Sequence, residues 1–518
     1  MTNTSPDTAT SLANGAGSSN GTPTTADLRS ALADLRSHGE LSAVSSEVHW
    51  NRELGAVSRV ALQRNSPGLL FENITDYNHE SSRCGKVTTN LLASHRRIAI
   101  LLGLDPETPY TSLVEHVREH NEKRIEPVRV DAGPVRDNIV RGADVDLHDL
   151  PVPHWHYLDG GRYINTFAAV VTRDPDDGTV NLGVYRGMIV GRNKIATLMV
   201  PSQGWGRHWA KWIERGEPMP VACVYGWHPV MDILAGSPIP QGVSEYDVMG
   251  GFLGAPVPLV QCETVDLQVP ATAEIVVEGH VSPDPDTYEW EGPFGEFTGY
   301  VSDVPKLRPT IEASCVTHRD DPIFRGTLEG SLPGSPGENS YLSSVQRAGI
   351  AWATLENARV PGIRQVYVHP VTNGTTIVVQ IDKVHEGHAK MVAAALWSSN
   401  AALYRYKYVI VVDEDVDPSD YSALDWAIAY RVQPGSDDVV TFPGSFGSPI
   451  DPSTPLEDRD VGRLGAGLWN RTLIDATRTF RYAPQEAWGG RTFPPTVLPA
   501  KDDLDLVHRR WADYAIDR

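Results

Sequence analysis

The stretch YINTFAAVVTRDPDDGTVNLGVYRGMIV (residues 163–190) decides the expected fold of the middle of the chain. Two runs rich in Val, Ile, Tyr and Phe flank RDPDDG, a cluster of turn-forming residues, and this pattern predicts a β-hairpin. Further β-rich runs follow at residues 195–200, 257–269 and 273–281. Many strands punctuated by Gly and Pro, with few helical patterns between them, predict an antiparallel sheet or barrel over residues 119–325.

A small α/β unit is expected on the N-terminal side, over residues 25–118. Leu28, Leu32 and Leu35 fall on one helical face, and Gly39 is placed to end that helix. A buried strand and a second helix are predicted for the segments at residues 68–73 and 92–104. Residues 1–24 are small and polar, so they are expected to form a disordered tail.

Strands and helices alternate on the C-terminal side, over residues 340–490. Strands are predicted at residues 362–370, 375–383 and 406–417, and helices at residues 388–399 and 421–432. This alternation predicts an α/β layer with a largely parallel sheet. Residues 491–518 follow as an extension. The expected fold class is therefore a mixed α+β and α/β multidomain protein.

Composition excludes several classes of function. The 518 residues carry 45 basic and 66 acidic side chains, a net charge of −21, which argues against a nucleic-acid partner. Four scattered cysteines without C-x-x-C spacing favour reduced thiols. No apolar run approaches the roughly 18 residues that span a bilayer, and the N-terminus does not resemble a signal peptide. We therefore expect a cytoplasmic protein without a membrane partner.

The segment EWEGPFGEFTGY (residues 289–300) carries Glu291 and Glu296 around a Gly-Pro-Phe-Gly turn. Four aromatic residues surround the two acids and predict a poorly solvated corner: Trp290, Phe294, Phe297 and Tyr300. Two carboxyls in such a corner cannot both ionise easily, so at least one pKa is expected to rise. A carboxylic acid with a raised pKa can deliver a proton near neutral pH. Helix-capping or surface acids are the alternative interpretation.

Arg186 lies in the apolar run NLGVYRG. A buried arginine is costly unless it is paired, so we expect a bidentate bond to a carboxylate. Glu291, Glu296 and a substrate carboxylate are the candidate partners, and a purely internal salt bridge is the alternative. Asn181 lies five residues earlier, where strict strand alternation places it on the opposite face. A bulge, for which Gly183 is the candidate, would bring both side chains into one site.

Other residues of the chain suggest a metal site and a phosphate site. Glu245 follows a Gly/Pro-rich loop, and together with Asn181 it offers ligands that suit magnesium or manganese. Lys390 in HEGHAK precedes a predicted helix and is able to neutralise a phosphate. His154 and His156 are also able to bind a metal, but histidines in a proline-rich loop are more often structural.

Together these segments resemble the UbiD family of reversible decarboxylases. The similarity rests on five stretches that follow the order of the family, at residues 162–186, 242–247, 262–279, 291–300 and 385–417. The combination of NLGVYR with EGPFGE is highly specific for it.

The resemblance implies an N-terminal α/β unit, a central flavin-reductase-like split β-barrel and a C-terminal α/β domain that forms homodimers or larger homo-oligomers. It implies prenylated FMN as the cofactor, supplied by a partner flavin prenyltransferase, and removal or addition of CO2 at an aromatic or unsaturated carbon. A divalent metal (Mn2+ or Mg2+) and a monovalent cation (K+ or Na+) are implied as well.

The resemblance also implies roles for individual residues. Its catalytic triad corresponds to Arg186, Glu291 and Glu296, with Glu296 as the proton donor and the other two residues positioning the substrate carboxylate. The residues implied in cofactor binding are Asn181, Arg186, Gln203, Glu245 and Lys390. Asn181 and Glu245 are also implied as metal ligands. Gly204 stands where the family has a third, histidine ligand, so we expect His208, one helical turn on, or water to complete the metal shell.

Two other functions remain open at this point. A glycoside hydrolase would use Glu291 and Glu296 as its acid and base and would need no flavin. A non-catalytic flavin-binding protein would bind FMN and leave every acid unchanged. The substrate is expected to contact two variable loops, at residues 330–340 and 442–449, whose Gly and Ser content suggests room for a ring.

Overall fold

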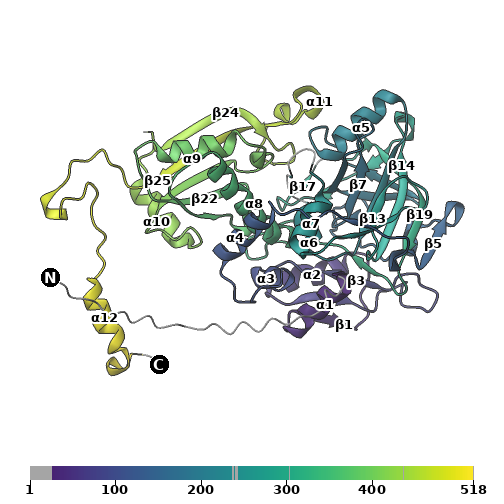
Figure 1. Cartoon of the computed structure of the whole chain (residues 1–518), viewed down its shortest axis with the longest axis horizontal. Coiled ribbons are helices and arrows are strands. Elements are labelled where there is room, and N and C mark those ends of the chain that lie inside the picture. Colours follow the sequence, from purple (N-terminus) through teal and green to yellow (C-terminus); the bar gives the residue numbers. More distant parts are fainter. Residues whose placement is uncertain (1–25, 236–238, 240–242, 303, 436, 517–518) are drawn as a thin grey trace, which may run out of the picture.

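The computed structural model of the chain describes residues 26–235, 239, 243–302, 304–435 and 437–516. Within them an N-terminal α/β region, a central β region and a C-terminal α/β region follow one another along the chain (Figure 1). The expected mixed multidomain fold is therefore confirmed. The tail predicted at residues 1–24 lies outside the described residues.

The N-terminal region is a four-stranded sheet with helices packed against it. The strand order is β1 (Leu41–Val44), β2 (Gly68–Phe71), β3 (Lys86–Thr89) and β20 (Ile323–Arg325). The helices are α1 (Leu28–Ser37), α2 (Glu53–Gln63), α3 (His95–Leu101) and α4 (Tyr110–His120). Strand β20 comes from the far end of the central region and pairs in parallel with β3. The N-terminal sheet is therefore completed by residues from beyond the N-terminal region.

Helix α1 forms as its sequence predicts. Asp27 accepts a hydrogen bond from a backbone N–H of the first turn, and Leu28, Leu32 and Leu35 are buried on one face. Gly39 follows the helix with a φ of +72°, a conformation that favours glycine after a helix end.

The central region is an eight-stranded antiparallel sheet that nearly closes into a barrel. Its order is β6 (Tyr163–Asn165), β9 (Gly187–Gly191), β10 (Lys194–Thr197), β19 (Thr310–His318), β14 (Ile275–Val281), β11 (Met219–Tyr225), β7 (Ala169–Arg173) and β8 (Val180–Val184). A further strand, β5 (Asn138–Arg141), pairs with β19. Both faces of the wall are buried, because Val170 of β7 joins one apolar core and Val171 joins another.

The predicted hairpin at residues 163–190 is present, but Gly183 does not form a bulge. Strands β7 and β8 pair in unbroken register, with Asn181 opposite Thr172 and Gly183 opposite Val170. The chain instead leaves the sheet at Tyr185 and Arg186, between the end of β8 and the start of β9. This break, rather than a bulge, allows Arg186 and Asn181 to face the same cavity.

Smaller elements surround the barrel. Two short hairpins hold the acidic motif: β15 (Glu289–Glu291) with β18 (Lys306–Arg308), and β16 (Phe294–Gly295) with β17 (Val301–Ser302). The run at residues 257–269 forms two antiparallel strands, β12 (Pro258–Gln261) and β13 (Gln268–Pro270), with β4 (Val128–Arg129) beside β12. The helices of this region are α5 (Gly204–Arg215), α6 (Val230–Ala235) and α7 (Glu245–Leu253).

The C-terminal region has a mixed five-stranded sheet in the order β21 (Ile363–Tyr367), β22 (Thr376–Ile381), β23 (Tyr408–Asp413), β25 (Gly467–Ala476) and β24 (Val439–Gly447). Its helices are α8 (Glu338–Asn357), α9 (His388–Trp397), α10 (Tyr421–Arg431) and the short α11 (Val461–Leu464). The prediction of a largely parallel sheet holds for the three central strands only. Both edge strands are antiparallel to their neighbours. A short connection without a crossover helix joins β21 to β22, and it permits only an antiparallel pair.

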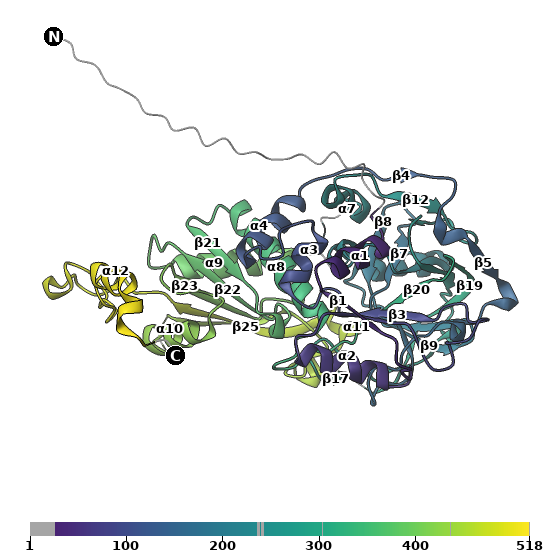
Figure 2. The same cartoon turned by 90° about the horizontal axis from the view of Figure 1, so that it is seen from below.

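Helix α8 joins the N-terminal and C-terminal regions. It packs against α4 on one side and against β21 on the other (Figures 1 and 2). Apolar side chains of α1, α4, α8 and the C-terminal sheet form one continuous core. The central barrel packs beside this joint body, and the main cavity lies where the two meet.

The C-terminal extension includes α12 (Lys501–Arg509), which lies away from the three regions in Figure 1 and has no buried residue. The four cysteines are buried and free, as their spacing predicts. Among the helices of the described residues, none combines the length and the apolar content needed to cross a bilayer.

Candidate active site

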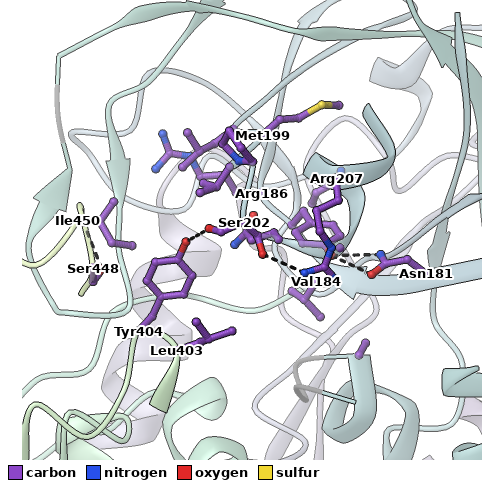
Figure 3. Close-up of a pocket in the computed structure, with 18 of the residues that line it drawn as sticks. Asn181, Val184, Arg186, Met199, Ser202, Arg207, Leu403, Tyr404, Ser448 and Ile450 are labelled. Atoms are coloured by element: carbon purple, nitrogen blue, oxygen red, sulfur yellow. Dashed lines mark hydrogen bonds between the residues drawn. The ribbon is translucent and has the colours of Figure 1, made fainter. Parts of the chain in front are cut away.

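A cavity of about 1280 Å³ lies between the barrel and the C-terminal region. Its lining includes β8, the start of α5, the hairpins of the acidic motif, α8 and the loop after β24. Figure 3 shows Asn181 and Arg186 of the central region together with Tyr404 and Ile450 of the C-terminal region. The hydroxyl groups of Ser202 and Tyr404 form a hydrogen bond that joins the two regions across the cavity.

Arg186 connects the two acids of the motif. One terminal nitrogen, Nη2, donates to Glu291 Oε2 at 2.8 Å, and the other, Nη1, bonds Glu296 Oε1 and Ser302 Oγ. The expected bidentate bond to a single carboxylate is therefore replaced by a bridge between two. Arg186 Nε is buried and has no hydrogen-bond partner among the described residues. One donor of this guanidinium thus remains available to a ligand.

The hairpins bring the two acids to one guanidinium. Glu291 ends β15 and Glu296 follows β16 directly, so the Gly-Pro turn between the strands reverses the chain. Asp159 Oδ1 accepts the Gly295 backbone N–H at 2.8 Å and holds the second strand in place. His156 bonds the same aspartate through Nδ1 at 3.2 Å, which favours a structural role for this histidine.

The apolar corner is smaller than the sequence predicts. Phe294 is buried, and its ring lies 5.5 Å from the Arg186 guanidinium. Trp290 and Tyr300, in contrast, are 60% and 65% exposed and do not line the cavity. Tyr163, from β6, supplies the missing contact, since its hydroxyl donates to Glu291 Oε1 at 2.7 Å.

Glu296 has a raised pKa. Burial raises its pKa, Arg186 opposes this shift, and the neighbouring charge of Glu291 adds to it. Its side chain lines the cavity, whereas that of Glu291 lies behind it against Tyr163. An acid in this position can hold a proton and release it to a molecule in the cavity.

Asn181 and Glu245 lie on the wall of the same cavity. Asn181 Nδ2 donates to the Tyr185 hydroxyl at 3.1 Å, and the Tyr185 ring stacks on Trp205 at 4.3 Å. A Cβ atom on Gly204 would fall 1.6 Å from Asn181 Oδ1, so a larger residue there would require the Asn181 side chain to move. The Asn181 amide thus occupies the space beside the start of α5.

Glu245, at the start of α7, is 9% exposed, and its Oε2 atom has no hydrogen-bond partner among the described residues. Burial raises its pKa to about 7, and a backbone hydrogen bond from Leu182 opposes this shift. Asn181 precedes Leu182 in the chain, so the carboxyl and the amide side chain approach the same part of β8. A buried carboxylate oxygen without a partner fits a cation ligand.

His208 lines the cavity from α5. Its Nδ1 lies 3.0 Å from Thr172 Oγ1, and its Nε2 lies 4.0 Å from Asp174 Oδ2. Burial lowers its pKa to about 4, so the imidazole is neutral near pH 7, the form that binds metals. In the part of the chain that the structure describes, no group of three or more His, Cys, Asp or Glu side chains is arranged to hold a metal ion.

Of the two other residues expected to bind the cofactor, the structure places one in the cavity and the other outside it. Gln203 lines the cavity at the start of α5. Lys390 lies on α9, outside the cavity lining, and its charge acts on the exposed Asp437. The structure therefore brings Gln203 to the site but not Lys390, because α9 covers the C-terminal sheet away from the cavity.

Arg405 is a cation of the cavity that the sequence analysis does not identify. It lies 4.8 Å from the Phe297 ring, donates to the Tyr404 carbonyl at 2.8 Å and keeps a buried Nε without a partner among the described residues. Burial lowers its pKa to about 9. Tyr404 and Tyr406 on either side have positive φ angles of 57° and 55°, a strained backbone typical of functional sites.

Glu329 is the second residue that the sequence analysis misses. It is 8% exposed, lines the cavity and belongs to GTLEGSL, a segment of small and apolar residues. A single acid in such a segment is a signal of the same kind as Glu291 in its motif. Of the two predicted variable loops, Asn339 in the first and Ser448 with Pro449 in the second line the cavity.

Comparisons with known proteins identify the family and the fold. Three domains of 3-octaprenyl-4-hydroxybenzoate carboxy-lyase match in order: the N-terminal domain at residues 32–117, the Rift-related domain at residues 126–332 and the C-terminal domain at residues 340–476. Pyrrole-2-carboxylic acid decarboxylase of Pseudomonas aeruginosa is 31% identical over 506 residues, which cover 94% of this chain and 98% of the relative.

Solved structures agree with this match. The closed form of vanillic acid decarboxylase from Sedimentibacter hydroxybenzoicus has a TM-score of 0.81 at 29% identity, over 95% of this chain and 99% of that chain. The UbiD-class enzyme HmfF from Pelotomaculum thermopropionicum, in complex with FMN, has a TM-score of 0.78 at 30% identity, over 94% of this chain and 100% of that chain. An evolved dimeric form of HmfF is in complex with prFMN, at a TM-score of 0.75 and 29% identity, over 94% of this chain and 99% of that chain.

A carboxy-lyase is the class of protein that these matches define. The chain belongs to the UbiD family, as the paired motifs NLGVYR and EGPFGE indicate. The two alternatives, a glycoside hydrolase and a non-catalytic flavin-binding protein, have no support from these comparisons.

Proposed function

We propose that the chain is a decarboxylase that uses prenylated FMN and acts reversibly on an aromatic, heteroaromatic or α,β-unsaturated carboxylic acid. The observation that carries the proposal is the bridge from Arg186 to Glu291 and Glu296 on the wall of a large cavity. The names of the relatives, which act on pyrrole-2-carboxylic and vanillic acids, support the substrate class.

The cavity has features that fit a flavin phosphate and a metal ion. Its volume of about 1280 Å³ exceeds the roughly 300–1,000 Å³ of ordinary ligand pockets, which leaves room for a cofactor and a small acid together. Buried Arg405 Nε has a free donor for an anion, and Glu245 Oε2 has a free acceptor for a cation. Asn181 offers a second oxygen ligand, Gln203 a further polar contact, and His208 or water the third ligand.

Oxygen ligands of this kind suit Mn2+ or Mg2+, which would join the protein to the cofactor phosphate. A monovalent cation, K+ or Na+, is proposed beside it, as the resemblance implies. Because the prenyl group must be added to FMN first, a flavin prenyltransferase is the proposed partner. A homodimer or a larger homo-oligomer is the proposed assembly.

Arg186 and Glu291 position the substrate. The free Nε–H of Arg186 points to a hydrogen bond with the substrate carboxylate. Glu291 accepts from Arg186 Nη2 and is itself held by the Tyr163 hydroxyl, so the guanidinium stays in place. When bound, prenylated FMN would supply the electron sink that lets the carbon–carboxylate bond break. Arg186 thus holds the leaving CO2 group at a fixed distance from Glu296.

Glu296 supplies the proton. Its raised pKa favours the protonated acid, and its side chain is buried in the wall of the cavity. After CO2 leaves, Glu296 donates its proton to the carbon that carried the carboxylate. In the reverse direction the same carboxylate removes that proton before CO2 adds.

One experiment tests this proposal as a whole. The protein would be co-expressed with a flavin prenyltransferase, and the released cofactor identified by mass spectrometry. Pyrrole-2-carboxylic, vanillic and cinnamic acids would then serve as probes, with CO2 release as the readout. We expect a prenylated flavin and turnover of at least one ring or vinyl acid. A protein that binds the cofactor and releases no CO2 from a broad panel of such acids would contradict the proposal.

A further inference from the structure

Glu329 is a buried acid that the proposed mechanism leaves without a role. Its side chain lines the main cavity, and its residue exposure is 8%. The hydrogen bond that its carboxylate receives from a side chain comes from Asn339 Nδ2 at 3.5 Å, the long limit for such a bond. A backbone hydrogen bond from Gly330 is the other bond to this carboxyl. A carboxyl group buried this far without an ion pair is costly, which makes it a candidate for a functional group.

The backbone of Glu329 runs beside that of Glu296. The Ser331 N–H donates to the Phe297 carbonyl at 3.2 Å. A Cβ atom on Gly330 would lie 3.4 Å from the Glu296 carbonyl oxygen. The two acids therefore start from adjacent stretches of chain, and both side chains line the same cavity.

Charged groups from several elements act on Glu329. Glu296 after β16 and Glu338 on α8 raise its pKa further once burial has raised it, to about 7. Arg59 on α2 and Arg405 interact with its charge from two other sides. Arg347 on α8 lines the same cavity, and His156 Nε2 lies 3.1 Å from the Glu329 carbonyl oxygen. The balance of these groups leaves Glu329 able to take up and release a proton near neutral pH.

The chemistry requires a second proton carrier. Decarboxylation converts a carboxylate and one proton into CO2 and a new C–H bond, so each turnover consumes a proton. Glu296 provides that proton and is left as a carboxylate. Because Glu296 is only 6% exposed, another group must return a proton to it before the next turnover.

We propose that Glu329 is the proton-relay residue that recharges Glu296 after each turnover. The inference rests on the proposed function. A proton from solvent forms an O–H bond on the Glu329 carboxylate. That bond breaks as the proton passes, directly or through one water, to the Glu296 carboxylate, and Glu329 is left ionised. No electron changes place, and the net input is the single proton that the reaction consumes.

The test compares the Glu329→Gln variant with the parent as cofactor-loaded protein. Glutamine keeps the shape of the side chain but carries no proton near pH 7. We expect kcat to fall by roughly 10²-fold, the low end for a lost proton transfer, with KM unchanged. In the parent, kcat should fall as pH rises through about 7, because Glu329 loses its proton. The variant should not show this pH-dependent fall. Exchange of the product C–H in deuterated water should slow in parallel with kcat.

Two further variants complete the design. Ser343→Ala changes a neutral residue of the same cavity lining and is the matched control, with an unchanged pH profile expected. Glu329→Asp keeps the acid with a shorter reach, so it should recover part of kcat, and it replaces the glutamine variant should that fail to fold. An aspartate variant no faster than the glutamine variant contradicts a relay.

A readout on cofactor-free protein separates this inference from the proposed function. Infrared titration of the parent should show protonated carboxylic acid bands that disappear as pH rises through about 7, and Glu329→Gln should lose part of this absorbance while the contribution of Glu245 remains. A variant with unchanged kcat, pH profile and exchange overturns the inference, and so does a raised KM at unchanged kcat. Failure of the parent itself to release CO2 would count against the proposed function instead.

Discussion

Glu291 Oε2 lies 2.8 Å from Arg186 Nη2, while the other oxygen of the same carboxylate accepts the Tyr163 hydroxyl at 2.7 Å. Both oxygens of Glu291 therefore accept hydrogen bonds, which fix the orientation of its side chain. Glu296 bonds Arg186 and Ser302 and lines the cavity. The two acids of one motif are thus suited to different tasks, one to orient Arg186 and the other to carry a proton.

Glu296→Gln is expected to lower kcat by roughly 10²–10⁴-fold, the range for a lost general acid, and to leave flavin binding intact. Glutamine fills the same space but cannot release a proton. The measurement is CO2 release together with deuterium exchange at the product carbon, and both should be lost while the flavin spectrum remains. Exchange as fast as in the parent would transfer the role of proton donor to Glu291.

Decarboxylation should slow with rising pH, because Glu296 must be protonated to act and its pKa is raised. The midpoint of this fall in rate should lie above pH ~4.3, the ordinary pKa of glutamate. The opposite direction, CO2 addition, needs the carboxylate form and should gain with rising pH. Rates in both directions are best measured in Glu329→Gln, whose own relay step is absent. A midpoint at the ordinary pKa of glutamate would contradict a buried acid as the proton donor.

Dialysis against a chelator should release both the metal and the flavin, because Asn181 and Glu245 would hold the phosphate through the metal. Metal analysis and the flavin absorbance of the dialysed protein give the result. Readdition of Mn2+ with the cofactor should restore binding. Full retention of flavin by metal-free protein would show that the cofactor does not depend on a metal.

His208→Ala should lower the metal content per chain and weaken flavin retention, because its imidazole is neutral near pH 7 and available as a third ligand. Asn181→Ala serves as the reference for loss of a ligand. If the metal content of His208→Ala equals that of the parent, water completes the shell and His208 only packs against Thr172.

Arg405→Gln should reduce cofactor affinity by more than tenfold, since loss of a hydrogen bond to a charged group costs roughly 1.5–3 kcal/mol. Lys390→Gln is the matched control and should bind the cofactor like the parent, because Lys390 lies outside the cavity lining. Equilibrium titration with FMN reports both affinities. Weaker binding in the lysine variant alone would restore the role that the sequence suggests for Lys390.

Local patterns predict the strands of the barrel well, but not where a strand ends. The alternation at residues 163–190 predicts β7 and β8 because it depends on neighbouring residues only. The break at Tyr185 and Arg186 depends on partners elsewhere, since β8 pairs with β7 while β9 pairs with β6 and β10. A bulge at Gly183 was therefore the wrong expectation.

The acidic pair was predictable and its surroundings were not. Five residues and a tight turn bring Glu291 and Glu296 together whatever the rest of the chain does. Glu329 and Arg405 reach the cavity only through packing of distant segments. The apolar segment around Glu329 marks it as unusual, but its local sequence does not predict which residues it meets. Lys390 shows the converse, because a suitable charge at the start of a helix carries no information on where the helix packs.

Strand β20 has a consequence for synthesis of the chain on the ribosome. The outer edge of β3 stays unpaired until residues 323–325 have left the exit tunnel, although the first three strands of that sheet end at residue 89. An exposed strand edge is a template for wrong pairing, so the nascent N-terminal region depends on the barrel emerging behind it. Premature termination anywhere before Ile323 therefore leaves an N-terminal fragment that is prone to aggregate rather than a smaller folded domain.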